Sequence, residues 1–317
     1  MDRFVTFCYL DRMPKLDSPE AVLHPPLPEG RAEWSVEESF RYCARVTRNH
    51  YENFPVGSIL VPRASRPFVH AVYAFARAAD DFADELKDPP RQLALLGEWG
   101  EELEAAFRGE ARHPVFVALR ETSRSLDIPI QEYRDLLKAF RMDVTVKRYP
   151  TFDDVLAYCR CSANPVGRLV LYIHGHKDPE LHRLSDRICT ALQLANFWQD
   201  VEVDLRKDRI YIPRCDMDEH GVTEEDLLAH RADDPFRKLL QFQVDRTREI
   251  FDEGRPLCDR LGGRLALEIK ATWLGGTRIL SKVERIGHDV FRQRPVITSF
   301  DKLAILWRAI FWRRDGR

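Results

Sequence analysis

The chain of 317 residues lacks an excess of either charge. Its 49 Lys and Arg residues nearly balance its 51 Asp and Glu residues, which leaves a formal net charge of −2 at pH 7. A chain without a basic excess has no overall attraction for nucleic acid or for an anionic membrane surface, so no nucleic-acid partner is expected. An anionic ligand would therefore have to be held by a local cluster of side chains.

The sequence also lacks the hydrophobic runs and cysteine pairs that mark several other classes of protein. No stretch of about 18 apolar residues is present, so no transmembrane helix is expected. The first residues, MDRFVTFCYLDRM, carry acidic groups and too short an apolar run for a signal peptide. Cys159 and Cys161 have no second pair at zinc spacing, and no CxxC is present among the 7 cysteines. We therefore predict a cytoplasmic protein with reduced thiols, with Cys159 and Cys161 buried on a helix.

Alternating β-branched runs, which would predict strands, are nearly absent, whereas helical patterns dominate from residue 35 onward. Residues 1–34 are rich in proline and predict an irregular N-terminal arm. We therefore predict an all-α fold with a single domain over residues 35–300, followed by a basic amphipathic segment over residues 301–317.

Two of the expected helices are strongly patterned. One starts after Pro62, with Ser65 as its N-cap, and runs through Leu86 with a buried apolar stripe at steps of four and three. The other lies near 185–205 and is apolar around most of its circumference, as expected of a central helix. Further helices are predicted near 130–146 and 152–176, the latter interrupted at Asn164-Pro165.

Each of the two patterned helices carries a polar row. In the segment DDFAD, Asp80 and Asp84 are one helical turn apart, about 5–6 Å, where two carboxylates repel. Magnesium prefers such carboxylates together with water and phosphate oxygens. Asn196, Asp200 and Asp204 repeat this spacing on the apolar helix, where uncompensated carboxylates would be costly. The rows therefore predict magnesium sites, and the alternative for the first row alone is a solvated acidic face.

Cationic side chains near these rows are candidates for binding a diphosphate. Arg77 lies one turn before Asp80, and Arg209 with Tyr211 follows the second row in the segment KDRIYIP. Each arginine also has a simpler alternative. Arg77 could form an ion pair with Asp81 or Asp80 within its own helix, and the helix dipole alone favours a basic residue such as Arg209 near a helix end.

Four segments, in their order and spacing, resemble the squalene/phytoene synthase family over about residues 35–300. They are DDFAD at 80–84, YCRCSANPVG at 158–167, QLANFWQDVEVD at 193–204 and DRIYIP at 208–213. The resemblance implies a class I terpenoid synthase (isoprenoid synthase) fold with a central cavity, and a diphosphate-bridged cluster of Mg2+. The catalytic, metal-binding residues that it implies are Asp80, Asp84, Asn196, Asp200 and Asp204. The substrate-binding residues that it implies are Tyr73, Arg77, Gln193, Arg209, Tyr211, Ala163, Val166 and Gly167.

Departures from the common family pattern favour one branch of the family. In HYENFPV at 50–56, Phe54 is kept and Tyr51 replaces the usual serine, and both are added to the substrate-binding set. Gln199 replaces an arginine of phytoene synthases, and glycine in TWLGGTRIL replaces a cavity tyrosine. Together with ENFPV, SANPVGRLVL and NFWQD, these features are similar to the hydroxysqualene synthases of bacterial hopanoid and squalene biosynthesis. Tyr51, Glu52 and Asn53 are candidates for positioning a water.

The resemblance implies a carbon–oxygen lyase that ionises presqualene diphosphate and captures the cation with water. No NADPH is expected, because no G-x-G-x-x-G segment follows a strand pattern. The alternatives are a prenyltransferase that makes presqualene diphosphate from two farnesyl diphosphates, a phytoene synthase, and a non-catalytic assembly factor. The segment LAILWRAIFWRR near the C-terminus is either a peripheral contact with the inner face of a membrane or a last helix packed on the domain.

Overall fold

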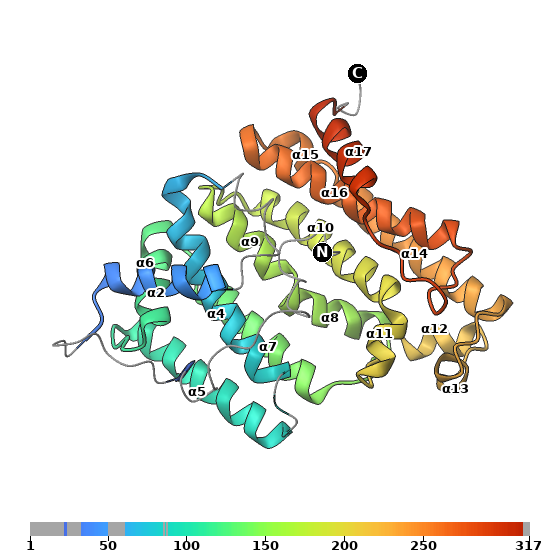
Figure 1. The fold of residues 1–317 in the computed structure, drawn as a ribbon, viewed down its shortest axis with the longest axis horizontal. Coiled ribbons are helices and arrows are strands. Elements are labelled where there is room, and N and C mark those ends of the chain that lie inside the picture. Colours follow the sequence, from blue (N-terminus) through green and yellow to red (C-terminus); the bar gives the residue numbers. More distant parts are fainter. Residues whose placement is uncertain (1–21, 24–32, 50–60, 85, 87, 313–317) are drawn as a thin grey trace. The chain divides into compact units, whose positions relative to one another are not determined.

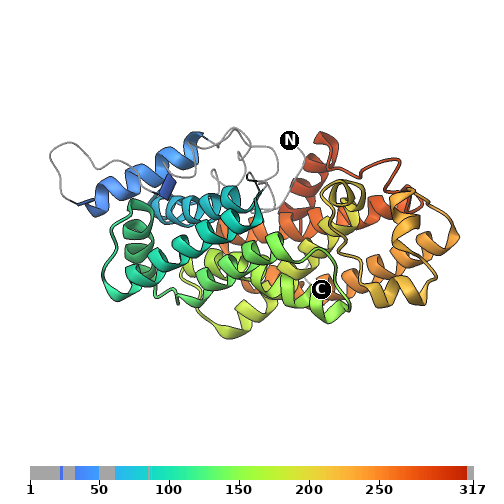
Figure 2. The same cartoon turned by 90° about the horizontal axis from the view of Figure 1, so that it is seen from below.

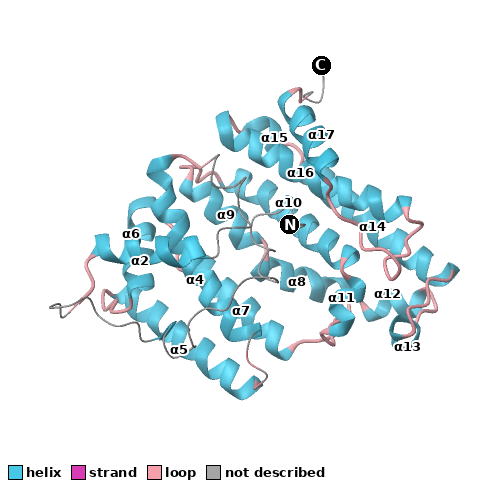
Figure 3. Cartoon of the chain, viewed as in Figure 1, coloured by secondary structure: helices cyan, strands magenta, loops and turns pink. Residues whose placement is uncertain are grey.

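The computed structural model describes residues 22–23, 33–49, 61–84, 86 and 88–312 (Figure 1). These residues form helices joined by loops (Figure 3), and their only β-type pairing is an isolated bridge between Arg148 and Ile210. The all-α prediction is confirmed. Within the described residues, no helix is both long and apolar enough to cross a bilayer.

Long helices and short helical turns follow one another along the chain. In order, they are α2 (Val36–Asn49), the short 3-10 helix η3 (Arg63–Ser65), α4 (Arg66–Asp84), α5 (Pro89–Arg108), α6 (Pro114–Leu126), α7 (Gln131–Thr145), α8 (Phe152–Ser162), α9 (Asn164–Ile173), α10 (Pro179–Gln199), α11 (Val201–Arg206), α12 (Arg214–Glu219), α13 (Glu224–Leu228), α14 (Asp234–Gly254), α15 (Leu257–Arg260), α16 (Gly263–Arg285) and α17 (Ser299–Ile310).

The described residues cluster into two compact units. The α4 unit comprises the described residues up to 145 together with 168–177, and the α10 unit comprises 146–167 and 178–312. Each unit is organised around the helix that carries one of the two polar rows. The predicted boundaries at residues 35 and 300 stay a prediction.

In the α4 unit, α4 is the central helix and packs against α2, α5, α6 and α7. Its Phe75 is fully buried and makes ring contacts with Trp99, Phe116 and Tyr133. The indole nitrogen of Trp99 donates a hydrogen bond to the carbonyl of Phe75 at 3.2 Å. The predicted apolar stripe is therefore confirmed along the middle of this helix.

The start of α4 was predicted closely and its end less so. The turn η3 ends at Ser65 and α4 begins at Arg66, so Ser65 directly precedes the helix, and its role as N-cap stays a prediction. The helix ends at Asp84, two residues before the predicted end. The carboxylates of the first row therefore lie in the last turns of the helix, where the exposed carbonyls favour cations over anions.

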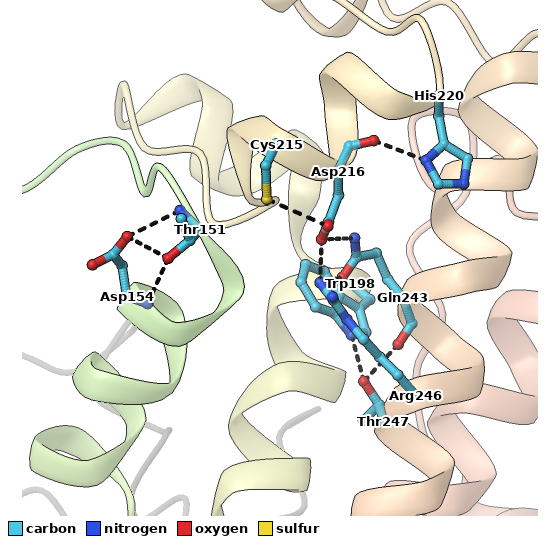
Figure 4. Close-up of polar contacts among 9 residues, drawn as sticks. All are labelled: Thr151, Asp154, Trp198, Cys215, Asp216, His220, Gln243, Arg246 and Thr247. Atoms are coloured by element: carbon cyan, nitrogen blue, oxygen red, sulfur yellow. Dashed lines mark hydrogen bonds and ion pairs between the residues drawn. The ribbon is translucent and has the colours of Figure 1, made fainter.

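In the α10 unit, α10 packs side by side with α14 and α16, which also contact each other (Figure 1 and Figure 2). A buried polar network joins α10 to α12 and α14 (Figure 4). The indole nitrogen of Trp198 donates to Thr247 Oγ1 at 2.8 Å, and Thr247 donates to the carbonyl of Gln243 at 2.7 Å. Asp216 accepts a hydrogen bond from Gln243 and forms an ion pair with Arg246. This network fixes the side of α10 that faces α14.

The other helix predictions are confirmed with small shifts. The expected helix near 130–146 is α7, and the expected interruption near Asn164-Pro165 separates α8 from α9 at Ala163. Cys159 and Cys161 are buried on α8. The expected helix near 185–205 is longer at its start and is divided at Asp200 into α10 and α11.

Candidate functional site

The first carboxylate row lies at the C-terminal end of α4. Asp80 is mostly buried, with 14% of its side chain exposed, whereas Asp84 is exposed. Burial raises the pKa of Asp80 well above its ordinary value, and the Asp84 carboxylate raises it further. Arg77 opposes that increase, while Asp81 and Asp143 add to it. Burial is therefore the main reason why the charged form of Asp80 is disfavoured, and the neighbouring carboxylates are the second reason.

Arg77 is committed to neighbours on its own helix. Its side chain is only 2% exposed, and its Nε donates to Asp81 Oδ2 at 3.1 Å while a terminal nitrogen pairs closely with the other oxygen. A third contact of 3.6 Å joins Nη1 to Asp80 Oδ2. The ion pair within the helix, the simpler alternative for this residue, is therefore present. The binding of diphosphate by Arg77 stays a prediction.

The second row lies on α10 and α11, and its middle residue, Asp200, is the junction between the two helices. Asp200 has φ −108° and ψ 15°, which ends α10 and begins α11. Its N–H nevertheless donates to the Asn196 carbonyl at 2.9 Å, and its carbonyl accepts from the Asp204 N–H at 2.8 Å. Hydrogen bonds between residues four apart continue through this junction. Asn196, Asp200 and Asp204 therefore keep the spacing of successive helical turns.

Asp200 has a guanidinium partner that the sequence analysis missed. The Arg294 side chain donates to both Asp200 oxygens, at 2.5 and 3.2 Å, and the Asp200 side chain is only 8% exposed. The neighbouring Gln199 donates to the carbonyl of Pro295 at 2.6 Å. These contacts hold the segment after α16 on the end of α10. Burial of Asp200 alone is therefore no reason to expect a metal there, because Arg294 already pairs with its charge, and the binding of magnesium by Asp200 stays a prediction.

The loop after α11 places Arg209 and Tyr211 beside Asp204. All three residues line one small pocket in the α10 unit, together with Phe197. The loop turns at Asp208, which has a left-handed φ of 56°. Arg209 and Tyr211 were predicted to accompany this row, and the structure brings them together with Asp204.

Arg148 fastens that turn, because its guanidinium donates to the Asp208 carbonyl and to the Asp208 carboxylate, both at 2.7 Å. The ring of Tyr211 stacks on Phe197 with centroids 3.7 Å apart, and Tyr149 and Tyr158 complete the aromatic cluster. Tyr211 is therefore positioned by aromatic packing. Its predicted contact with diphosphate or intermediate is untested.

The remaining predicted substrate-binding residues divide into three groups. Tyr73 on α4 and Gln193 on α10 are half-buried, and Ala163 and Val166 are buried near the break between α8 and α9. Their place along a hydrocarbon channel stays a prediction. Tyr51 and Phe54 lie outside the described part of the chain, as do Glu52 and Asn53, which were predicted only as candidates for positioning a water.

Gly167 has a packing role that the sequence analysis did not foresee. A Cβ added there would collide with Ser185 Oγ and Cys189 Sγ of α10. The glycine therefore allows the start of α9 to approach α10 closely, whatever its relation to a channel.

Magnesium fits the chemistry of the donors, although neither row alone provides a complete set. Within the described residues, no group of three or more His, Cys, Asp or Glu side chains is arranged to hold a metal ion. The first row nevertheless offers carboxylate oxygens, and a divalent cation would favour the charged form of Asp80, which burial and the Asp84 carboxylate disfavour. The two rows belong to different compact units, and a shared cavity stays a prediction.

Comparisons with known proteins cover most of the chain. The family model described as squalene/phytoene synthase matches residues 47–301. A 15-cis-phytoene synthase of Synechococcus elongatus is 30% identical over 295 residues, which cover 89% of this chain and 95% of that protein. A hydroxysqualene synthase of Rhodopseudomonas palustris is 38% identical over 236 residues, which cover 74% of this chain and 80% of that protein.

A solved structure agrees with these relatives. The crystal structure of the squalene synthase HpnC from Alicyclobacillus acidocaldarius is 45% identical to this chain and matches it with a TM-score of 0.76. The match covers 80% of this chain and 95% of that one. The all-α architecture is accordingly the isoprenoid synthase fold that the sequence predicted. Both carboxylate rows lie within the residues matched by the family model, and the chain belongs to the squalene/phytoene synthase family.

Proposed function

We propose that the chain is a hydroxysqualene synthase, a carbon–oxygen lyase that converts presqualene diphosphate to hydroxysqualene and diphosphate. One observation carries the choice within the family. The chain is 38% identical to a hydroxysqualene synthase and 45% identical to the squalene synthase HpnC, but only 30% identical to a phytoene synthase. The phytoene synthase match is the longer one, so the contrast in identity, rather than in coverage, supports this function.

The proposed reaction needs no nucleophilic side chain. The C–O bond of presqualene diphosphate breaks and its electron pair leaves with the diphosphate. The resulting cation rearranges to an allylic cation, and water adds to it with loss of a proton. Aromatic ring faces along the predicted channel would stabilise the positive charge of the carbocation.

The polar residues have separate tasks in this proposal. Asp80 and Asp84 on α4, with Asn196, Asp200 and Asp204 on α10 and α11, would hold magnesium. When bound, the metal would neutralise charge on the leaving diphosphate. Arg209 and Tyr211, which share a pocket with Asp204, would bind diphosphate oxygens directly. Since Arg148 and the aromatic cluster fix their loop, these two residues would be oriented before the substrate arrives.

A second candidate is the preceding reaction of the same chemistry, the condensation of two farnesyl diphosphates to presqualene diphosphate. Phytoene synthase activity is a third, supported by 30% identity over 89% of the chain. All three reactions ionise a prenyl diphosphate with the same carboxylates. A non-catalytic role is disfavoured because Asp80, Asp84, Asp200 and Asp204 are all present.

The test supplies purified protein with presqualene diphosphate and magnesium in the absence of NADPH, and identifies the lipids by gas chromatography with mass spectrometry. Hydroxysqualene that forms only with magnesium is the expected result. The matched control is Asp84→Asn, which keeps the shape of an exposed side chain while removing its charge. Formation of presqualene diphosphate from farnesyl diphosphate, with no turnover of presqualene diphosphate, would instead assign the earlier step.

A further inference from the structure

The outer face of α17 exposes a concentration of large apolar side chains. Phe300 is 86% exposed, Leu303 67%, Trp307 64% and Ile310 59%, and Phe311 directly after the helix is 60% exposed. These positions follow one another at steps of three and four, so they form one stripe along the helix. Elsewhere in the described residues, exposed large hydrophobic side chains occur only singly, as at Val36, Leu228 and Phe242. A contiguous exposed stripe of this kind marks an interaction surface.

The opposite face of α17 is firmly attached to the α10 unit. Ile305 and Ala309 are buried in a cluster with Leu274, Ile279 and Ile297. The helix is therefore a fixed part of the unit, and its outer stripe does not result from a loosely attached tail. The two sequence-based alternatives for this segment are thus compatible, because one face packs on the protein while the other remains exposed.

Polar contacts secure both ends of the same helix. At its start, Asp301 caps the helix with Thr298 and forms ion pairs with Arg278 and Lys282. Just after its end, the indole nitrogen of Trp312 donates to Asp259 at 2.8 Å. Because the helix is held at both ends, its backbone need not be ordered when the surface binds a partner.

The charges on α17 are suited to an anionic surface. Its single acidic residue, Asp301, is buried and paired, so it adds no exposed negative charge. Its exposed charged side chain is Arg308, and Lys302 is half-buried on the same helix. In the sequence, Arg313, Arg314 and Arg317 follow Trp312, with one acidic residue, Asp315, among them. Aromatic and aliphatic side chains beside cations are the pattern of a helix that lies in the headgroup region of a bilayer.

We propose that the outer face of α17 docks on the surface of an anionic lipid bilayer, with Trp307, Ile310 and Phe311 inserted at the level of the headgroups. A second copy of this chain fits the face less well. Symmetric pairing of two copies would bring Arg308 and Lys302 of one copy near those of the other. The helix has no exposed carboxylate to neutralise these charges. The proposal concerns a surface outside the carboxylate rows and does not depend on the reaction proposed above.

The experiment uses the full chain and flotation with vesicles of phosphatidylcholine containing phosphatidylglycerol. In the variant Leu303→Ser/Trp307→Ser/Ile310→Ser, the partition coefficient should fall by at least about tenfold. Leu228→Ser is the matched control, since Leu228 is 61% exposed on α13 of the same unit, and it should bind as the wild type does. Arg308→Glu should weaken binding to these vesicles but not to vesicles of phosphatidylcholine alone.

A second measurement uses the wild type and one conservative variant, so that it does not depend on the folding of the triple variant. Lipids brominated on their acyl chains should quench the tryptophan fluorescence of the wild type more than that of Trp307→Phe. Absence of vesicle binding by the wild type, or equal binding by the triple variant, would overturn the proposal. A dimer without lipid that the triple variant converts to a monomer would also overturn it and would assign the face to a second copy.

Discussion

The two carboxylate rows differ in where their positive partners come from. On α4, Arg77 pairs with Asp80 and Asp81, three and four residues further along the same helix. On α10 and α11, Asp200 pairs with Arg294, which is 94 residues away in the sequence. The first arrangement follows from helix geometry alone. The second depends on how the segment after α16 packs against α10.

The difference shows that burial of a carboxylate does not by itself predict a metal ligand. Asp200 is buried, yet a guanidinium compensates its charge in the structure. Asp80 has Arg77 nearby, yet its pKa remains raised because burial and the Asp84 carboxylate outweigh that cation. In the α4 row, therefore, the charged form of Asp80 is disfavoured although a cation lies nearby. Substitutions in both rows can show whether the rows nevertheless act together, and whether near and distant ion pairs contribute differently.

The largest expected effect comes from removing one carboxylate from each row. Asp84→Asn and Asp204→Asn should each reduce kcat/KM for presqualene diphosphate by about a thousandfold, roughly 4 kcal/mol, if both rows hold magnesium. Both should also raise the magnesium concentration required for activity. The control is Asp218→Asn, an exposed carboxylate on α12. Near wild-type kinetics for either variant would remove that residue from the metal-binding set.

The next effect tests the local pair. Arg77→Met should lower the free energy of unfolding by about 3–5 kcal/mol, because it removes the guanidinium from the buried carboxylate of Asp81. Urea unfolding followed by circular dichroism measures this change. Adding Asp81→Asn to Arg77→Met should recover a large part of the loss. A double variant no more stable than Arg77→Met would mean that packing of the arginine, not its charge, stabilises α4.

A smaller effect is expected from the distant pair. Arg294→Met should lower the free energy of unfolding by about 1–3 kcal/mol, since the Arg294 side chain is 28% exposed and water screens part of its interaction. The same urea experiment applies, with Asp200→Asn as the compensating change. A loss as large as that of Arg77→Met would contradict the expected difference between the two rows.

The sequence predicted both central helices because each is defined by local periodicity. The apolar stripe of α4 and the nearly continuous apolar surface of α10 follow from residues three and four apart. The same spacing predicted that Asp80 and Asp84 share a face, as do Asn196, Asp200 and Asp204. The sequence also predicted that Arg209 and Tyr211 lie near Asp204, because only a short loop separates them.

Features that depend on distant parts of the chain were not predictable in this way. Nothing in the sequence near Arg294 distinguishes it from the other arginines of the chain, and no spacing relates Asp143 of α7 to Asp80. The junction at Asp200 was also missed, because NFWQDVEVD contains neither the proline nor the glycine that would indicate a break. How the two rows combine depends on tertiary packing, and local patterns carry no information about it.

The last effect is similar in size to that of the distant pair but depends on pH, and it concerns a carboxylate with neither a near nor a distant ion-pair partner among the described residues. Burial raises the pKa of Glu268 on α16 to about 7. Since its pKa in the unfolded chain is lower, the folded protein binds the proton more tightly, and the free energy of unfolding falls as pH rises from 4.5 to about 7. Glu268→Gln should therefore stabilise the protein by about 1–3 kcal/mol at pH near 8 and by much less near 5.5, measured by urea unfolding. Glu249→Gln, at an exposed position on α14, is the control. An equal gain at both pH values would mean that the glutamine improves packing and that Glu268 is not held protonated by burial.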